Sequence, residues 1–113
     1  MPSSRKVSFT KEFKKNLKSL AKRYRKIKSD LLPFVTALES GKLPGDQIKG
    51  IPFKVHKVRV PNTSAKKGKQ GGFRLLYYLE LPDQITLLSI YSKNVQENIS
   101  TADIMCIINN FKR

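Results

Sequence analysis

Apolar positions in the first third of the chain follow the period of an α-helix. They recur at intervals of three or four residues, at Phe13, Leu17, Leu20, Tyr24 and Ile27. Side chains spaced in this way lie along one side of a helix, so we predict a helix that begins at Lys11. Thr10 precedes it and is a favoured residue type for capping its first turn.

A second helix is predicted immediately afterwards, and the two helices would form a hairpin. Ser29 or Asp30 is the expected cap, and Pro33 would then fall in the first turn, where a missing N–H does no harm. Gly41 is the expected end of this helix. Its apolar side consists of Leu31, Leu32, Val35 and Leu38.

Four other segments have the composition or the two-residue alternation of β-strands. They are Lys6–Phe9, Phe53–Val60, Phe73–Leu81 and Ile85–Tyr91. Pro82 and Asp83 separate the last two and suit a tight reversal. In the strand that begins at Phe73, alternate residues that include Tyr77 are predicted to face the core. Residues 42–52 are rich in Gly and Pro and predict irregular chain.

A last helix is predicted after Ser100, which forms a capping-box pattern with Asp103. Its packing stripe is Ile104, Ile107, Ile108 and Phe111. The elements together predict an α+β fold in one domain, residues 1–113: two N-terminal helices packed on an antiparallel sheet of about four strands, with a C-terminal helix.

Charge adds the first indication of function. The chain has 23 Lys and Arg against 8 Asp and Glu, a formal net charge of +15. Such an excess favours an anionic partner, of which nucleic acid, an acidic protein and an anionic membrane are the candidates. A plainly solubilising surface is the alternative. The basic surface of the first helix is likewise either a phosphate-binding face or a solvated one.

The sequence lacks the residues that several kinds of site require. The single Cys106 excludes an internal disulfide and a cysteine zinc cage, and the single His56 excludes a histidine pair. We therefore predict no metal and no cofactor. No apolar run approaches the ~20 residues of a membrane span, and the N-terminus lacks the apolar core of a signal peptide. We expect a cytoplasmic protein that does not engage membranes.

Cations inside otherwise apolar strands are the strongest local signal, because a sheet does not need them to fold. They are Lys57, Arg59, Arg74 and Lys93, with Tyr91 two residues before the last of these. Clustered cations with aromatic residues suit single-stranded nucleic acid. They can also stabilise the charge that builds up when a ribose 2′-hydroxyl attacks its own phosphate. His56 alternates onto the other side of its strand, so we interpret it as structural.

The loop between the second and third of these strands is also basic. Lys67 and Lys69 lie there among glycines and polar residues, a composition that fits a clamp over phosphates. A long hairpin loop with solubilising charges is the alternative interpretation. Tyr77 and Phe73 are interpreted as core residues.

Three sequence stretches together resemble a known family. These are KVRV, then KQGGFRLLYY after the basic loop, then LLSIYSKN. They resemble the RelE/HigB toxins of bacterial type II toxin–antitoxin modules, most closely the HigB-like branch. The basic first helix, the second helix, the sheet and the terminal helix also follow that family's order. The resemblance implies a RelE-like fold and a metal-independent endoribonuclease, an mRNA interferase that commonly cuts mRNA on the ribosome and thereby inhibits translation.

The resemblance also implies roles for individual residues. Lys57, Arg74, Tyr91 and Lys93 would form the catalytic set, in which Arg74 stabilises the cleaved phosphate and Lys57 or Lys93 handles protons. The RNA-binding residues would be Arg59, Lys54, Lys67 and Lys69. Two departures stand out: Asn94 follows Lys93 where some members carry arginine, and no tyrosine follows Tyr91.

The expected partners are mRNA, the ribosome and a cognate antitoxin with a helix-turn-helix or an acidic segment. Operator DNA would be bound only through the antitoxin complex. A related branch, the ParE-like toxins, has a similar fold and inhibits DNA gyrase, so fold alone does not decide between the two. The alternatives are therefore a non-catalytic gyrase inhibitor and a plain RNA-binding module.

Overall fold

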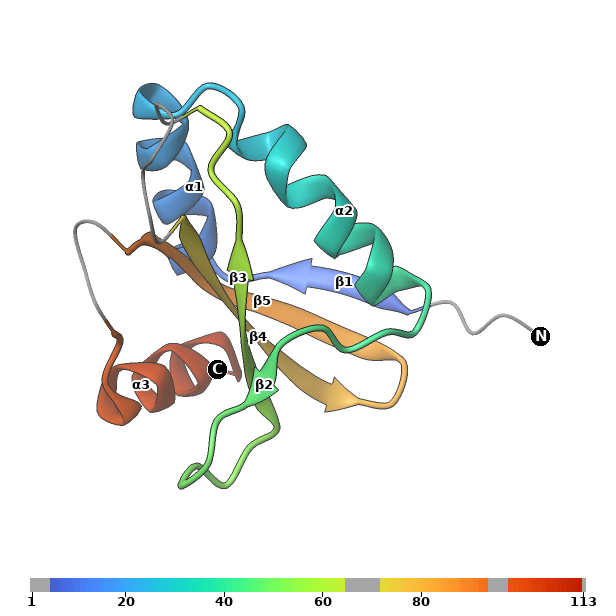
Figure 1. The fold of residues 1–113 in the computed structure, drawn as a ribbon. Helices are drawn as coiled ribbons and strands as arrows, with labels where there is room; N and C mark the ends of the chain where they lie inside the picture. The colour runs from blue at the N-terminus through green and yellow to red at the C-terminus, as the bar shows by residue number, and fades with distance from the viewer. Residues whose placement is uncertain (1–4, 65–71, 94–97, 113) are drawn as a thin grey trace.

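The computed structural model of this chain describes residues 5–64, 72–93 and 98–112. The elements in chain order are β1 (Lys6–Phe9), α1 (Lys11–Arg23), α2 (Ile27–Glu39), β2 (Asp46–Gln47), β3 (Val55–Val60), β4 (Phe73–Leu81), β5 (Gln84–Ser92) and α3 (Thr101–Lys112). The strands form one five-stranded sheet in the order β1-β5-β4-β3-β2. Figure 1 shows α1 and α2 on one side of this sheet and α3 on the other.

The α+β class is confirmed, whereas the antiparallel sheet of about four strands is corrected in two ways. β1 runs parallel to β5, with Lys6 beside Gln84 and Phe9 beside Leu87. β2 is a fifth strand that pairs with β3 inside the segment predicted to be irregular. Two polar residues carry no hydrophobic period, so nothing local marks β2 as a strand.

Each face of the sheet buries its own apolar cluster. On the first face, Phe13 of α1 and Ile27, Leu31 and Leu38 of α2 pack with residues of the sheet that include Tyr77. On the second face, Ile104 and Ile108 of α3 pack against Leu76, Tyr78 and Leu88. The alternation predicted for β4 is therefore confirmed, and both of its faces are covered by helices.

The predicted start of α1 is confirmed at the level of single atoms. The Thr10 side-chain oxygen accepts a hydrogen bond of 2.9 Å from the backbone N–H of Phe13. Its hydroxyl also donates to the carbonyl of Leu88 at 2.9 Å, which ties the first turn of α1 to β5. Ser100 likewise accepts from the N–H of Asp103, at 3.1 Å, before α3.

The predicted start of α2 is wrong by a few residues. α2 begins at Ile27, its N-cap Lys26 makes no side-chain capping bond, and Pro33 lies inside the helix. Asp30 does not cap this helix because it lies inside it, and its carboxylate instead binds the chain after β3. Thr63 donates to both Asp30 oxygens, from its backbone N–H at 3.0 Å and its hydroxyl at 2.6 Å.

Candidate nucleic-acid interface

Three predicted site residues form a row across the three central strands. Arg59 of β3 lies directly opposite Arg74 of β4, and Arg74 lies directly opposite Tyr91 of β5. Residues directly opposite one another in a sheet point to the same face. All three residues therefore lie on one face of the sheet. This is the face that α3 covers, since Tyr91 belongs to the same apolar cluster as Ile104 and Ile108 of α3.

Lys57 lies on the same face, one step further along β3. It is two residues from Arg59, a rise of about 7 Å along a strand. Its ammonium donates a hydrogen bond of 3.1 Å to Oδ1 of Asn98, just before α3. Lys57 is half-buried and Arg59 is exposed, so the row opens to solvent on the β3 side.

The inner part of the row is covered. Arg74 is 8% exposed and Tyr91 is 7% exposed. The Arg74 guanidinium donates from Nη1 to the carbonyl of Phe73 at 3.3 Å and makes further interactions. In the chain as it stands, Arg59 is therefore the member of the row that an incoming anion meets first.

The Tyr91 hydroxyl is buried and has no hydrogen-bond partner within the described part of the chain. Burial raises the pKa of this phenol because the charged form is disfavoured there, and the positive charge of Arg74 opposes the effect. The phenol is therefore neutral at physiological pH and still carries a proton that it can donate.

Gly72 fixes the point at which β4 enters the row. Its φ is +54°, and a Cβ there would lie 2.5 Å from the carbonyl oxygen of Val60. A side chain at this position would collide with the β3 backbone. The Gly72 carbonyl accepts the backbone N–H of Lys93 at 3.0 Å, so Lys93 follows β5 at the same end of the sheet as the row.

One of the predicted RNA-binding residues, Lys54, does not join this row. Lys54 precedes β3 at the opposite end from Arg59, about 17 Å away along an extended strand. It instead borders a pocket of about 430 Å³ with Tyr78 and Glu80. Lys67 and Lys69 lie outside the described residues.

His56 lies on the other face, as the alternation predicted. Its ring stacks on Tyr77 with centroids 5.1 Å apart and planes 5° from parallel. Nδ1 is buried and has no partner within the described residues, and burial lowers the pKa of the imidazole while Asp46 partly opposes this. Tyr77 in turn donates its hydroxyl proton to the carbonyl of Pro44. These contacts fit a structural role for His56.

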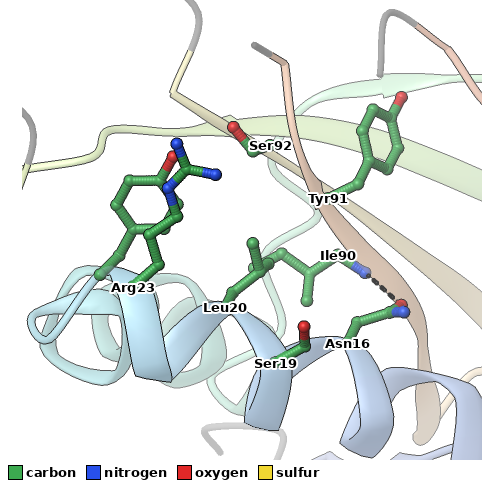
Figure 2. A pocket seen from close by; sticks show the side chains of 8 residues that line it. Asn16, Ser19, Leu20, Arg23, Ile90, Tyr91 and Ser92 are labelled. Atoms are coloured by element: carbon green, nitrogen blue, oxygen red, sulfur yellow. Dashed lines mark hydrogen bonds between the residues drawn. The ribbon is translucent and has the colours of Figure 1, made fainter. Parts of the chain in front are cut away.

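A cavity of about 320 Å³ between α1 and the end of β5 was missed by the sequence interpretation. Figure 2 shows Leu20 and Ile90 between the helix and the strand, with Tyr91 directed away from α1. The polar residues of the cavity that lie on α1 are Asn16, Ser19 and Arg23. Their spacing of three and four is a second helical stripe beside the apolar one, and that stripe was the available signal.

No protein-family model matches this chain, and no curated protein shows significant similarity to it. No group of three or more His, Cys, Asp or Glu side chains capable of holding a metal ion occurs in residues 5–64, 72–93 and 98–112. Within those ranges, every helix is too short or too polar to cross a membrane.

Proposed function

We propose that this chain is an mRNA endoribonuclease of the RelE/HigB type, the toxin of a toxin–antitoxin pair. The single observation that supports it most is the row of Arg59, Arg74 and Tyr91 on adjacent strands, with Lys57 one step away. Two guanidinium groups and a neutral phenol on one face can stabilise the added phosphoryl charge and protonate the leaving oxygen in a phosphodiester cleavage.

The reaction we propose takes its nucleophile from the substrate. The ribose 2′-oxygen attacks the adjacent phosphorus, a 2′-O–P bond forms, and the P–O5′ bond breaks. Arg74 and Arg59 stabilise the additional negative charge on the phosphoryl oxygens. Tyr91 gives its proton to the departing 5′-oxygen, because its raised pKa keeps it protonated. Lys57 or Lys93 takes the proton of the 2′-hydroxyl, which requires the accepting amine to be in its uncharged form.

The burial of Arg74 and Tyr91 sets a condition on this chemistry. RNA reaches them only if the contacts of α3 loosen, and the bond between Lys57 and Asn98 is one polar contact at that boundary. The same burial is the observation that favours a second candidate, an RNA-binding module without catalysis. In that case Arg59 would bind the RNA backbone, and the buried Arg74 and Tyr91 would only hold Arg59 in position.

Partners follow from the proposal and from the charge. A net charge of +15 suits the ribosome and mRNA, and it also suits an acidic antitoxin segment that neutralises it. A small helix-turn-helix or acidic protein encoded next to this chain would support the toxin assignment.

Mapping mRNA 5′ ends after induced expression tests the proposal. The unchanged chain should stop growth and produce cuts within codons, whereas Arg74→Ala and Tyr91→Phe should lower cleavage by about 100-fold, a typical loss for one charge-stabilising or proton-donating group. Lys54→Ala is the control of comparable charge change and should cut normally.

Tyr91→Phe separates chemistry from folding. It removes a hydroxyl that has no partner among the described residues, so it should leave the free energy of unfolding unchanged or slightly higher. RNA binding without any cuts in the unchanged chain would leave the binding module as the function. A change in DNA supercoiling without cuts would instead identify a gyrase inhibitor.

A further inference from the structure

The cavity between α1 and the end of β5 shares its border with the candidate site. Tyr91 and Ser92 of β5 contribute to the cavity, yet the Tyr91 ring points away from α1 (Figure 2). It points to the face that carries Arg74, which lies directly opposite Tyr91 in the sheet. The cavity and the row therefore lie on opposite faces of β5, at the same end of the same strand. A flexible strand of RNA that passes this end contacts both once the contacts of α3 loosen.

The walls of the cavity are held in place before any ligand arrives. Asn16 Oδ1 accepts hydrogen bonds from the Ser89 hydroxyl at 2.9 Å and from the Ile90 N–H at 3.2 Å. Its Nδ2 donates to a Glu12 oxygen at 3.1 Å, which leaves one amide proton for another partner. Such a fixed polar group orients a ligand at little entropic cost.

The chemistry of the lining fits a nucleobase with its phosphate. Leu20 supplies an apolar floor above the buried Ile90, and the exposed Ser19 hydroxyl supplies a donor and an acceptor at the rim. The guanidinium of Arg23 lies 5.7 Å from the ring centre of Tyr24, and that ring packs edge-on against Phe73 at 5.3 Å. Arg23 is exposed and carries a charge suited to phosphate. A volume of about 320 Å³ is in the lower range of small-ligand pockets.

We infer that this cavity is a nucleotide subsite, which takes one base of the RNA strand whose neighbouring phosphate lies at Arg74 and Tyr91. The base lies on Leu20 and bonds to Asn16 and Ser19, while Arg23 holds its phosphate. This inference rests on the proposed ribonuclease function and extends it, because a base bound beside the cut gives the enzyme a sequence preference.

Binding of single nucleotides tests the subsite without requiring cleavage. The four nucleoside monophosphates AMP, GMP, CMP and UMP are titrated separately into the full chain, and amide shifts are followed by NMR. At least one should shift the amides of Leu20 and Ile90. Arg23→Ala should weaken its binding about tenfold, because a charge-assisted contact is lost. Arg25→Ala, an equal charge change outside the cavity, should alter it by less than about twofold.

Ser19→Trp is the second variant, since the side chain is exposed and a large ring there fills the cavity without disturbing the core. It should abolish the nucleotide shifts and change which base is found beside the cut. The subsite is excluded if no nucleotide shifts these amides, or if Arg25→Ala weakens binding as much as Arg23→Ala. If the chain cuts RNA but no nucleotide binds in this titration, the proposed function stands and the subsite is excluded. If a nucleotide binds in the cavity but the chain never cuts RNA, the subsite stands and the proposed function is excluded.

Discussion

Gly45 shows how closely β2 approaches β3. Its φ is +88°, and a Cβ there would lie 2.3 Å from the Lys57 carbonyl oxygen. Gly50 has a similar φ of +84°, yet a Cβ there would meet nothing within 4 Å. Both glycines therefore have a left-handed backbone conformation, but only at Gly45 would a side chain collide with the neighbouring strand.

Substituting alanine at the two positions separates these effects. Gly50→Ala should cost about 1 kcal/mol, the penalty of a left-handed conformation for a residue with a Cβ. Gly45→Ala should cost about 3 kcal/mol or more, because the backbone of β2 must also move away from β3. Chemical denaturation measures both values, and equal losses would contradict the close approach.

His56 predicts how stability depends on pH. Burial lowers its pKa from the usual 6.5, so the unfolded chain takes up a proton on this ring more readily than the folded chain does. Stability from this residue is therefore present above pH 6.5 and is lost as the pH falls toward the folded-state pKa, with a slope of at most about 1.4 kcal/mol per pH unit.

His56→Phe is the matched variant, since it keeps an aromatic ring against Tyr77 and cannot titrate. Its free energy of unfolding should change less between pH 7.5 and pH 5.5 than that of the unchanged chain. His56 is the only histidine, so one NMR titration reports its pKa directly. A pKa above 6.5 would contradict the prediction.

At the scale of elements, the two helix caps identified from sequence differ in the hydrogen bonds that their hydroxyls make. Thr10 is 3% exposed, and its hydroxyl both accepts from Phe13 and donates to Leu88. Ser100 is exposed and accepts one bond from Asp103. Ser100→Ala should cost about 1 kcal/mol, whereas Thr10→Ala should cost about 2–3 kcal/mol because the Leu88 carbonyl also loses its donor.

Thr10→Ser is the control for this comparison, because it keeps the hydroxyl and removes only a methyl group. In thermal unfolding experiments it should recover most of the stability that Thr10→Ala loses beyond the loss in Ser100→Ala. Equal losses in Thr10→Ala and Ser100→Ala would mean that the bond to β5 contributes nothing beyond the cap.

The elements also show what local patterns predict and what they do not. The alternation of β3 and β4 predicted which side Arg59 and Arg74 face, because side-chain direction depends only on residue parity. It did not predict that they lie opposite each other, since register depends on the pairing of strands that a long loop separates. Lys54, like Arg59, is a cation in an otherwise apolar segment, but it lies at the other end of β3. Asp30 resembled a cap, and only the folded chain brings Thr63 to it.

At the scale of the whole molecule, the net charge of +15 acts on stability and on binding in opposite directions. Like charges in a compact fold repel one another, and salt screens that repulsion. Raising KCl from 50 to 500 mM should therefore stabilise the free chain, and a gain of about 1 kcal/mol would raise Tm by about 4–6 °C.

The same increase in salt should weaken RNA binding, because each phosphate that a cation replaces releases condensed counterions. For single strands the slope of log K against log [salt] is about −0.7 per phosphate contact, so four contacts imply a loss of about 600-fold over this range. A ten-nucleotide 2′-O-methyl RNA serves as the probe, since it lacks the attacking hydroxyl and cannot be cut. Arg59→Ala should make the slope shallower by about 0.7, whereas Lys54→Ala should leave it unchanged if only the row contacts the strand. Identical slopes in the unchanged chain and both variants would mean that RNA is held elsewhere on this basic surface.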